Sequence, residues 1–103
     1  MSFTIVDESG HRGDNSGLLL YNGGTVCDDS FDENSAAAIC TILGFESGES
    51  SWLSGQLWAI QNDYNILLDD VRCLDTFWLS CTFSETHNCG HSEDVFLTCS
   101  VGG

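Results

Sequence analysis

Short apolar or alternating runs, separated by Gly, Ser, Asp and Asn, recur along most of the chain. Runs of this kind between turn-forming residues are typical of β-strands. They predict strands at 3–6, 17–21, 25–27, 56–60, 65–71 and 95–99. The segments 9–16 and 46–55 are rich in polar and small residues and are predicted as loops, the second of which carries Trp52.

One segment shows helical spacing of its apolar residues instead, which are Ala36, Ala37, Ile39, Cys40 and Leu43. Asp32 or Ser30 is the candidate N-cap, and Gly44 is the candidate stop. The spacing predicts a helix at about 33–43, and 76–81 is predicted as a short helical turn. One main helix among several short strands indicates a small α+β domain.

Length and charge narrow the class of protein. The 103 residues predict a single domain, 1–103, in which burial alone provides a small margin of stability. Sixteen acids oppose two basic residues, Arg12 and Arg72. This charge argues against binding to nucleic acid or an anionic membrane surface. The apolar runs are too short to insert into a membrane. The acidity indicates either solubility, including adaptation to a salty medium, or divalent-cation binding.

The cysteine content indicates the compartment. Six cysteines in 103 residues predict three disulfides formed in an oxidising environment. Spacing alone leaves the pairing open, although Cys73 and Cys81 form the loop that is easiest to close. The chain start, Met1-Ser2-Phe3-Thr4, lacks the basic residues of a signal peptide. We therefore expect a mature extracellular domain with Met1 added.

Carboxylates lie beside, or within a few residues of, three cysteines: Cys27, Cys73 and Cys89. The acids concerned are Asp28, Asp29, Asp69, Asp70, Glu93 and Asp94. A disulfide would fix the backbone next to these carboxylates. Clustered carboxylates on a rigid frame suit a hard cation such as calcium, which prefers oxygen ligands. The pattern therefore predicts a divalent-metal site.

Several motifs occur in a fixed order along the chain. They are Tyr-Asn-Gly at 21–23, Gly-Thr-Val-Cys-Asp-Asp-Ser-Phe at 24–31, Asp-x-Asn-x-Ala-Ala-x-x-Cys-x-x-Leu-Gly-Phe at 32–45, Leu-Asp-Asp-Val-Arg-Cys at 68–73, Trp78 and Cys81, and His-Asn-Cys-Gly-His-Ser-Glu-Asp-Val at 87–95. Over 3–99 this order resembles the scavenger receptor cysteine-rich (SRCR) domain. Six cysteines match the group A type rather than the eight-cysteine group B.

The resemblance implies a fold in which a curved antiparallel sheet cradles one helix. It implies the disulfides Cys27–Cys89, Cys40–Cys99 and Cys73–Cys81. It also implies an extracellular setting, either secreted or in the ectodomain of a membrane protein. Members are mostly non-enzymatic binding modules for protein or polyanionic ligands, and several use calcium.

The chain departs from the SRCR pattern at three points. The tryptophan that usually precedes Gly-Thr-Val-Cys is missing, and Phe31 stands where tryptophan is common. The basic patch of polyanion-binding members is also absent, since Arg12 and Arg72 are the basic residues of the chain. That absence argues against direct binding of bacterial polyanions.

The resemblance also implies which residues hold the cation. The first site is expected at Asp28, Asp29 and Glu93. A second, weaker site is expected at Asp69 or Asp70 with Asn88, and Asp32 is a further candidate. Calcium is the expected cofactor, with magnesium as the alternative. The competing interpretation is that these acids cap turns and the helix N-terminus, Asp32 above all.

A cation with an open coordination position would let an anionic group of a partner complete its shell. Candidate ligand contacts outside the acidic motifs are Arg12, Arg72 and Trp52. Arg72 is interpreted first as structural. Arg12-Gly13-Asp14 spells an integrin-recognition tripeptide, but such tripeptides recur by chance in loops, and adhesion through it is disfavoured.

Two further functions compete with cation-dependent binding. The chain is alternatively a structural or adhesion module of a larger secreted or receptor protein, whose acidity serves solubility or mineral association. Zinc binding through His87, Cys89, His91 and Cys81 does not fit the usual paired spacing. Catalysis by Cys89 with His91 requires a thiolate, which a disulfide lacks. We therefore expect no enzymatic activity.

Overall fold

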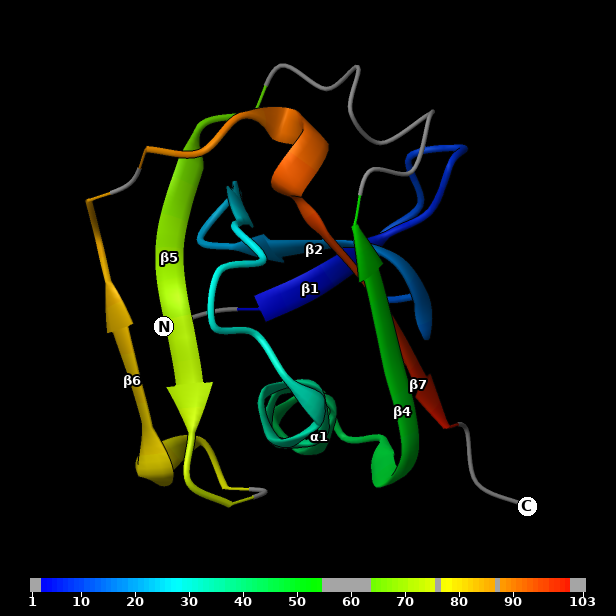
Figure 1. Ribbon diagram of the computed structural model, residues 1–103. Coiled ribbons are helices and arrows are strands. Elements are labelled where there is room, and N and C mark those ends of the chain that lie inside the picture. The colour runs from blue at the N-terminus through cyan, green and yellow to red at the C-terminus, as the bar shows by residue number, and fades with distance from the viewer. Residues whose placement is uncertain (1–2, 55–63, 76, 87, 101–103) are drawn as a thin grey trace.

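The computed structural model describes residues 3–54, 64–75, 77–86 and 88–100 (Figure 1). Its strands are β1 (Phe3–Val6), β2 (Ser16–Tyr21), β3 (Gly24–Val26), β4 (Glu46–Ser54), β5 (Ile66–Cys73), β6 (Cys81–Ser84) and β7 (Val95–Ser100). Its helices are α1 (Glu33–Ile42) and two 3₁₀ turns, η2 (Trp78–Ser80) and η3 (His91–Glu93). No helix in these ranges is both long and apolar enough to cross a lipid bilayer.

The strands form one sheet in the order β4-β7-β2-β3-β5-β6, with β1 paired to β2. The β1–β2, β2–β3, β2–β7, β4–β7 and β5–β6 pairs are antiparallel, whereas β3 and β5 run parallel. A parallel pair needs a long crossover, and here α1 and β4 lie in that connection. The expected curved sheet is therefore antiparallel except at this one pair.

The sheet curls around α1, which Figure 1 shows end-on between β5 and β4. The core contains the inward side chains of β1, β2, β5 and β7 together with the buried face of the helix. It includes Ile5, Leu19, Val26, Ala36, Ala38, Ile39, Leu68, Val71, Val95 and Leu97, none of which is exposed. Small alanines on the helix allow the strands to approach it closely.

The ends of α1 follow from the residues that flank it. The Asp32 carboxylate accepts a hydrogen bond from the Ser35 backbone N–H at 2.9 Å, as an N-cap does. Gly44 follows the helix with φ +89°, a left-handed conformation that glycine adopts without steric cost. The predicted helix is confirmed to within one residue, and Asp32 rather than Ser30 is the cap.

All six cysteines are paired, in the three pairs that the family resemblance implies. Cys40–Cys99 ties α1 to β7, and Cys73–Cys81 ties β5 to β6. Cys27–Cys89 ties the end of β3 to the segment before η3, across 62 residues of sequence. Each bridge joins elements that are distant in sequence or at a sheet edge, as expected for a domain with a small core.

The predicted loop at 46–55 is wrong, because 46–54 forms the edge strand β4. β4 pairs with β7 through Glu46, Ser51, Trp52, Leu53 and Ser54, with an irregularity between Glu46 and Ser51. Neighbouring-strand contacts outweigh intrinsic propensity in a sheet, so polar residues tolerate an edge position. β6 was also not predicted. The predicted strand at 56–60 lies outside the described residues, and the predicted turn at 76–81 contains η2.

Candidate cation-binding site

The turn after β3 brings the first acidic motif against two other segments. The Cys27 backbone N–H donates to the Leu68 carbonyl of β5 at 2.8 Å, and the Asp28 N–H donates to the Glu93 carbonyl of η3 at 2.8 Å. Ser30 in this turn has φ +62°. The turn that carries Asp29 is therefore held by backbone hydrogen bonds to both β5 and η3.

The Cys27–Cys89 disulfide lies against two carboxylates. Cys27 Sγ is 3.6 Å from Glu93 Oε2, and Cys89 Sγ is 3.7 Å from Asp29 Oδ2. Ligand atoms of these four residues lie within 4.8 Å of one another. Because both sulfurs are bonded to each other, they do not act as thiolate ligands. The oxygens of Asp29 and Glu93 are the donors that this group offers to a cation.

A second group of carboxylates meets the first at Asp29. Ligand oxygens of Asp29, Asp69 and Asp70 also lie within 4.8 Å of one another. Side chains alternate between faces along a regular strand, but β5 has an irregular register between Asp69 and Arg72, and Asp70 has φ +53°. The left-handed residue breaks the alternation. Consecutive carboxylates of β5 thereby approach the same point.

The donor set fits a hard divalent cation. The carboxylates of Asp29, Asp69, Asp70 and Glu93 form what we call the carboxylate cluster, in which Asp69 is buried with 4% of its surface exposed. Asp29 and Glu93 are half-buried and Asp70 is exposed. Negative groups held this close repel one another, and the repulsion is larger where water is partly excluded. Calcium and magnesium prefer such oxygen ligands.

Asn88, a predicted ligand of the second site, lies near the second group. It lines an open hollow of about 310 Å³ together with Asp69, Asp70, Ser84 and Thr86. These residues supply carboxylate, hydroxyl and amide oxygens, all of which are calcium ligands. The hollow therefore provides a route from solvent to the carboxylate cluster.

Asp28 and Asp32 lie outside both groups of converging ligand atoms among the described residues. The Asp28 carbonyl accepts from the Phe31 N–H at 3.0 Å, so its backbone closes the turn. Asp32 Oδ1 accepts from both the backbone N–H and the hydroxyl of Ser35. The structure thus gives Asp32 the capping role that was its alternative interpretation.

The candidate ligand contacts lie apart from one another. Trp52 lies on β4, is half-buried and packs edge-on against Phe31 with ring centroids 5.3 Å apart. Arg72 is exposed on β5 opposite Thr82, and it forms no ion pair with another described residue. Arg12 is exposed in the loop between β1 and β2. Trp52 is therefore a packing residue at the core edge, while both arginines are accessible to solvent.

The loop that carries Arg12 is ordered by Asp7. The backbone N–H groups of His11 and Ser9 donate to the Asp7 carboxylate at 3.0 and 2.9 Å. The hydrogen bond from His11 is the main reason why the pKa of Asp7 lies below its ordinary value. This carboxylate is therefore occupied in shaping the loop.

One feature of the site was missed in the sequence. His91 Nδ1 lies 2.7 Å from Asp94 Oδ2, and Asp94 is buried with 2% of its surface exposed. The pair spans η3, the turn that presents Glu93, and Asp94 also bridges to Cys27. His91 and Asp94 are three residues apart and directly follow Gly90, and this spacing could have indicated the pair in the sequence. Since no free cysteine remains, this histidine takes part in packing the turn rather than in a Cys-based zinc site.

Comparison with known proteins identifies a matching family and related sequences. The model of the scavenger receptor cysteine-rich domain family matches residues 12–100. Macrophage receptor MARCO of Mesocricetus auratus is 38% identical over 88 residues, which are 79% of this chain and 17% of that protein. MARCO of Mus musculus is 37% identical over 91 residues, 80% of this chain and 16% of that protein. The chain thus spans about a sixth of these relatives.

Solved structures agree in fold. The dimeric form of the SRCR domain of mouse MARCO matches with a TM-score of 0.63 and 33% identity, covering 84% of this chain and 85% of that one. The third SRCR domain of murine neurotrypsin matches with a TM-score of 0.72 and 26% identity, covering 99% of this chain and 100% of that one. With the three disulfides and the curled sheet around one helix, these matches show that the chain belongs to the scavenger receptor cysteine-rich domain family, in its six-cysteine group A form.

Proposed function

We propose that this domain is an extracellular ligand-binding module whose binding depends on a divalent cation held at the carboxylate cluster. Calcium is the proposed cation, with magnesium as the alternative. The ligand is a protein or polyanion that presents an anionic group. The non-enzymatic, receptor-type character of SRCR modules is the basis of this assignment.

The shared position of Asp29 is the observation that carries the proposal. Its carboxylate lies within 4.8 Å of ligand atoms in both acidic groups, so it joins Glu93 on one side to Asp69 and Asp70 on the other. Carboxylates without a cation gain little by lying this close to Asp29. The Cys27–Cys89 bridge and the backbone hydrogen bonds to Leu68 and Glu93 hold them there. A divalent cation offsets the repulsion that this arrangement creates.

The cation also explains how so acidic a domain binds an anionic ligand. Calcium takes about six to eight oxygen ligands, and with one oxygen from each carboxylate a group of two or three carboxylates leaves several of these positions unfilled. Water fills the remaining positions until an anionic group replaces it. The net charge of −14 repels polyanions at a distance, so binding requires the local positive charge of the bound ion.

The experiment is surface plasmon resonance on immobilised dextran sulfate, with unsulfated dextran as the reference surface. We expect binding in about 1 mM calcium, a concentration suited to extracellular calcium modules, and its loss in EGTA. Asp29→Asn should weaken binding at least about tenfold, equal to about 1.4 kcal/mol. Glu8→Gln is the matched control, because Glu8 is exposed and lies outside the carboxylate cluster.

Binding that persists in EGTA, or that falls equally in Asp29→Asn and Glu8→Gln, would contradict the proposal. Such a result would favour the alternative, in which the domain is a structural or adhesion module of a larger protein. In that alternative, the acidic surface serves solubility or mineral association through many equivalent weak sites.

A further inference from the structure

The loop between β5 and β6 exposes three large apolar side chains. Leu74 is 81% exposed, Phe77 64% and Leu79 98%. We call these three residues the apolar loop. Six large hydrophobic residues are exposed in the described part of the chain, and four of them lie between Leu74 and Phe83. A single exposed leucine needs no explanation, but a concentration of apolar side chains marks an interaction site.

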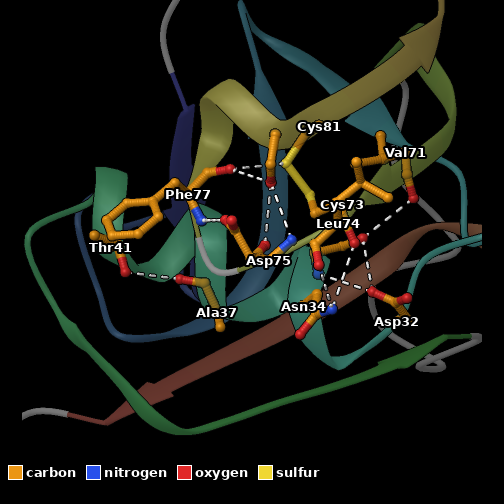
Figure 2. The surroundings of a disulfide bond; sticks show 12 residues. Asp32, Asn34, Ala37, Thr41, Val71, Cys73, Leu74, Asp75, Phe77 and Cys81 are labelled. Carbon is orange, nitrogen blue, oxygen red and sulfur yellow. Dashed lines mark hydrogen bonds between the residues drawn. A yellow bond between two sulfur atoms is a disulfide. The ribbon is translucent and has the colours of Figure 1, made fainter.

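A disulfide and several hydrogen bonds hold the described residues of the apolar loop in place. The Cys73–Cys81 disulfide closes it at its base (Figure 2). Within it, the Phe77 backbone N–H donates to Asp75 Oδ1 at 2.9 Å, and the Ser80 hydroxyl donates to the Phe77 carbonyl at 2.6 Å. The Leu74 N–H donates to the Ser80 carbonyl at 3.3 Å. Binding through a fixed loop loses little conformational entropy.

Contacts below the loop fix its orientation. Trp78 turns inward, stacks on Phe83 with ring centroids 5.6 Å apart, and packs edge-on against Phe3 at 5.0 Å. On the helix side, Asn34 Nδ2 lies 3.5 Å from the carbonyl oxygens of Cys73 and Leu74 (Figure 2). Trp78 is the anchor, and the apolar loop is left facing solvent.

The surroundings of the apolar loop are acidic. Asp75 is exposed within it, and Asp32 and Glu33 are exposed beside Asn34 at the start of α1. Arg72, just before Cys73, is the nearby basic residue. Anionic membranes and a second copy of this domain are both disfavoured, because each domain carries a net charge of −14. A small molecule is disfavoured because such ligands bind in concave pockets.

We propose that the apolar loop docks against the apolar face of a basic amphipathic helix in a protein partner. Leu79 and Phe77 pack on that face, and basic side chains beside it meet Asp75, Asp32 and Glu33. Interfaces commonly have this form, in which a few apolar anchors form the centre and charged residues form the rim. The loop lies at the end of β5 beside α1, whereas η3, which carries Glu93, lies near the opposite end of β5 (Figure 1). The apolar loop and the carboxylate cluster share no residue.

The test is fluorescence anisotropy with a designed amphipathic helical peptide of leucine and lysine, in EGTA so that bound calcium plays no part. The control peptide replaces lysine with glutamate. We expect the wild-type domain to bind the first peptide and not the second. Leu79→Ser and Phe77→Ser should each weaken binding at least about tenfold, as hot-spot anchors do. Leu53→Ser is the matched control, because Leu53 is 56% exposed on β4, away from the loop.

Several outcomes would overturn this proposal. They are no binding of the lysine peptide by the wild-type domain, an equal effect of Leu79→Ser and Leu53→Ser, and wild-type binding to phosphatidylcholine vesicles that Leu79→Ser abolishes. A dimer seen by sedimentation velocity in the wild type and lost in Leu79→Ser would likewise assign the loop to self-association. Asp29→Asn should change peptide binding by no more than about twofold, so failure of the cation proposal remains a separate result.

Discussion

Asp29 shows how far single residues were predictable. Its proximity to Glu93 was expected once the family implied the Cys27–Cys89 pair, and the two carboxylates do converge beside that bridge. The convergence of Asp69 and Asp70 on the same carboxylate was not expected. It depends on the irregular register of β5 and on the left-handed backbone of Asp70. A strand pattern does not reveal either feature.

Asp32 supports a prediction about stability. Its carboxylate accepts two hydrogen bonds from Ser35, whose hydroxyl also lies 3.2 Å from the Val71 carbonyl. Asp32→Ala removes the cap and should lower the free energy of unfolding by about 1 kcal/mol. Urea denaturation of the oxidised protein, followed by circular dichroism, measures this. Glu8→Ala is the control for the lost charge, and an equal loss in both variants would refute the capping role.

At the scale of elements, local patterns predicted α1 well and strand pairing poorly. The capping residues of α1 and the helical spacing of its apolar residues lie within its own segment of sequence. The bounds of the helix could therefore be predicted. β4 is polar and was predicted as a loop, because its strand conformation comes from pairing with β7. The parallel β3–β5 pair depends in the same way on a partner distant in sequence. Such contacts are long-range, and residue periodicity does not report them.

Substitution of Gly17 tests the close approach of β1 and β2, which are paired antiparallel. A Cβ at this position would collide with the carbonyl group of Val6, which is backbone and cannot move aside alone. Gly17→Ala should therefore lower the free energy of unfolding by roughly 1–3 kcal/mol, the usual cost of overpacking, as measured by urea denaturation. Gly90→Ala is the matched control, because a Cβ there has no atom within 4 Å. Similar stability of both variants would contradict the close approach.

At the scale of the whole molecule, charge and disulfides together define the domain. A net charge of −14 weakens a compact state through self-repulsion, while three disulfides restrict the unfolded chain. Composition and motif order predicted an oxidising compartment, a lack of nucleic-acid binding and a need for a cation. The apolar loop did not, because exposure of Leu74, Phe77 and Leu79 depends on Trp78 turning inward.

The most direct measurement is a thermal melt of the oxidised domain, titrated with calcium at constant ionic strength, on wild type, Asp29→Asn and Glu8→Gln. Cation at ten times its dissociation constant should stabilise the fold by about 1.4 kcal/mol, equivalent to roughly 5–10 °C in a domain of this size. We predict a saturable rise in wild type and Glu8→Gln that Asp29→Asn abolishes. A rise that does not saturate, or that survives in Asp29→Asn, would contradict a defined cation site at the carboxylate cluster.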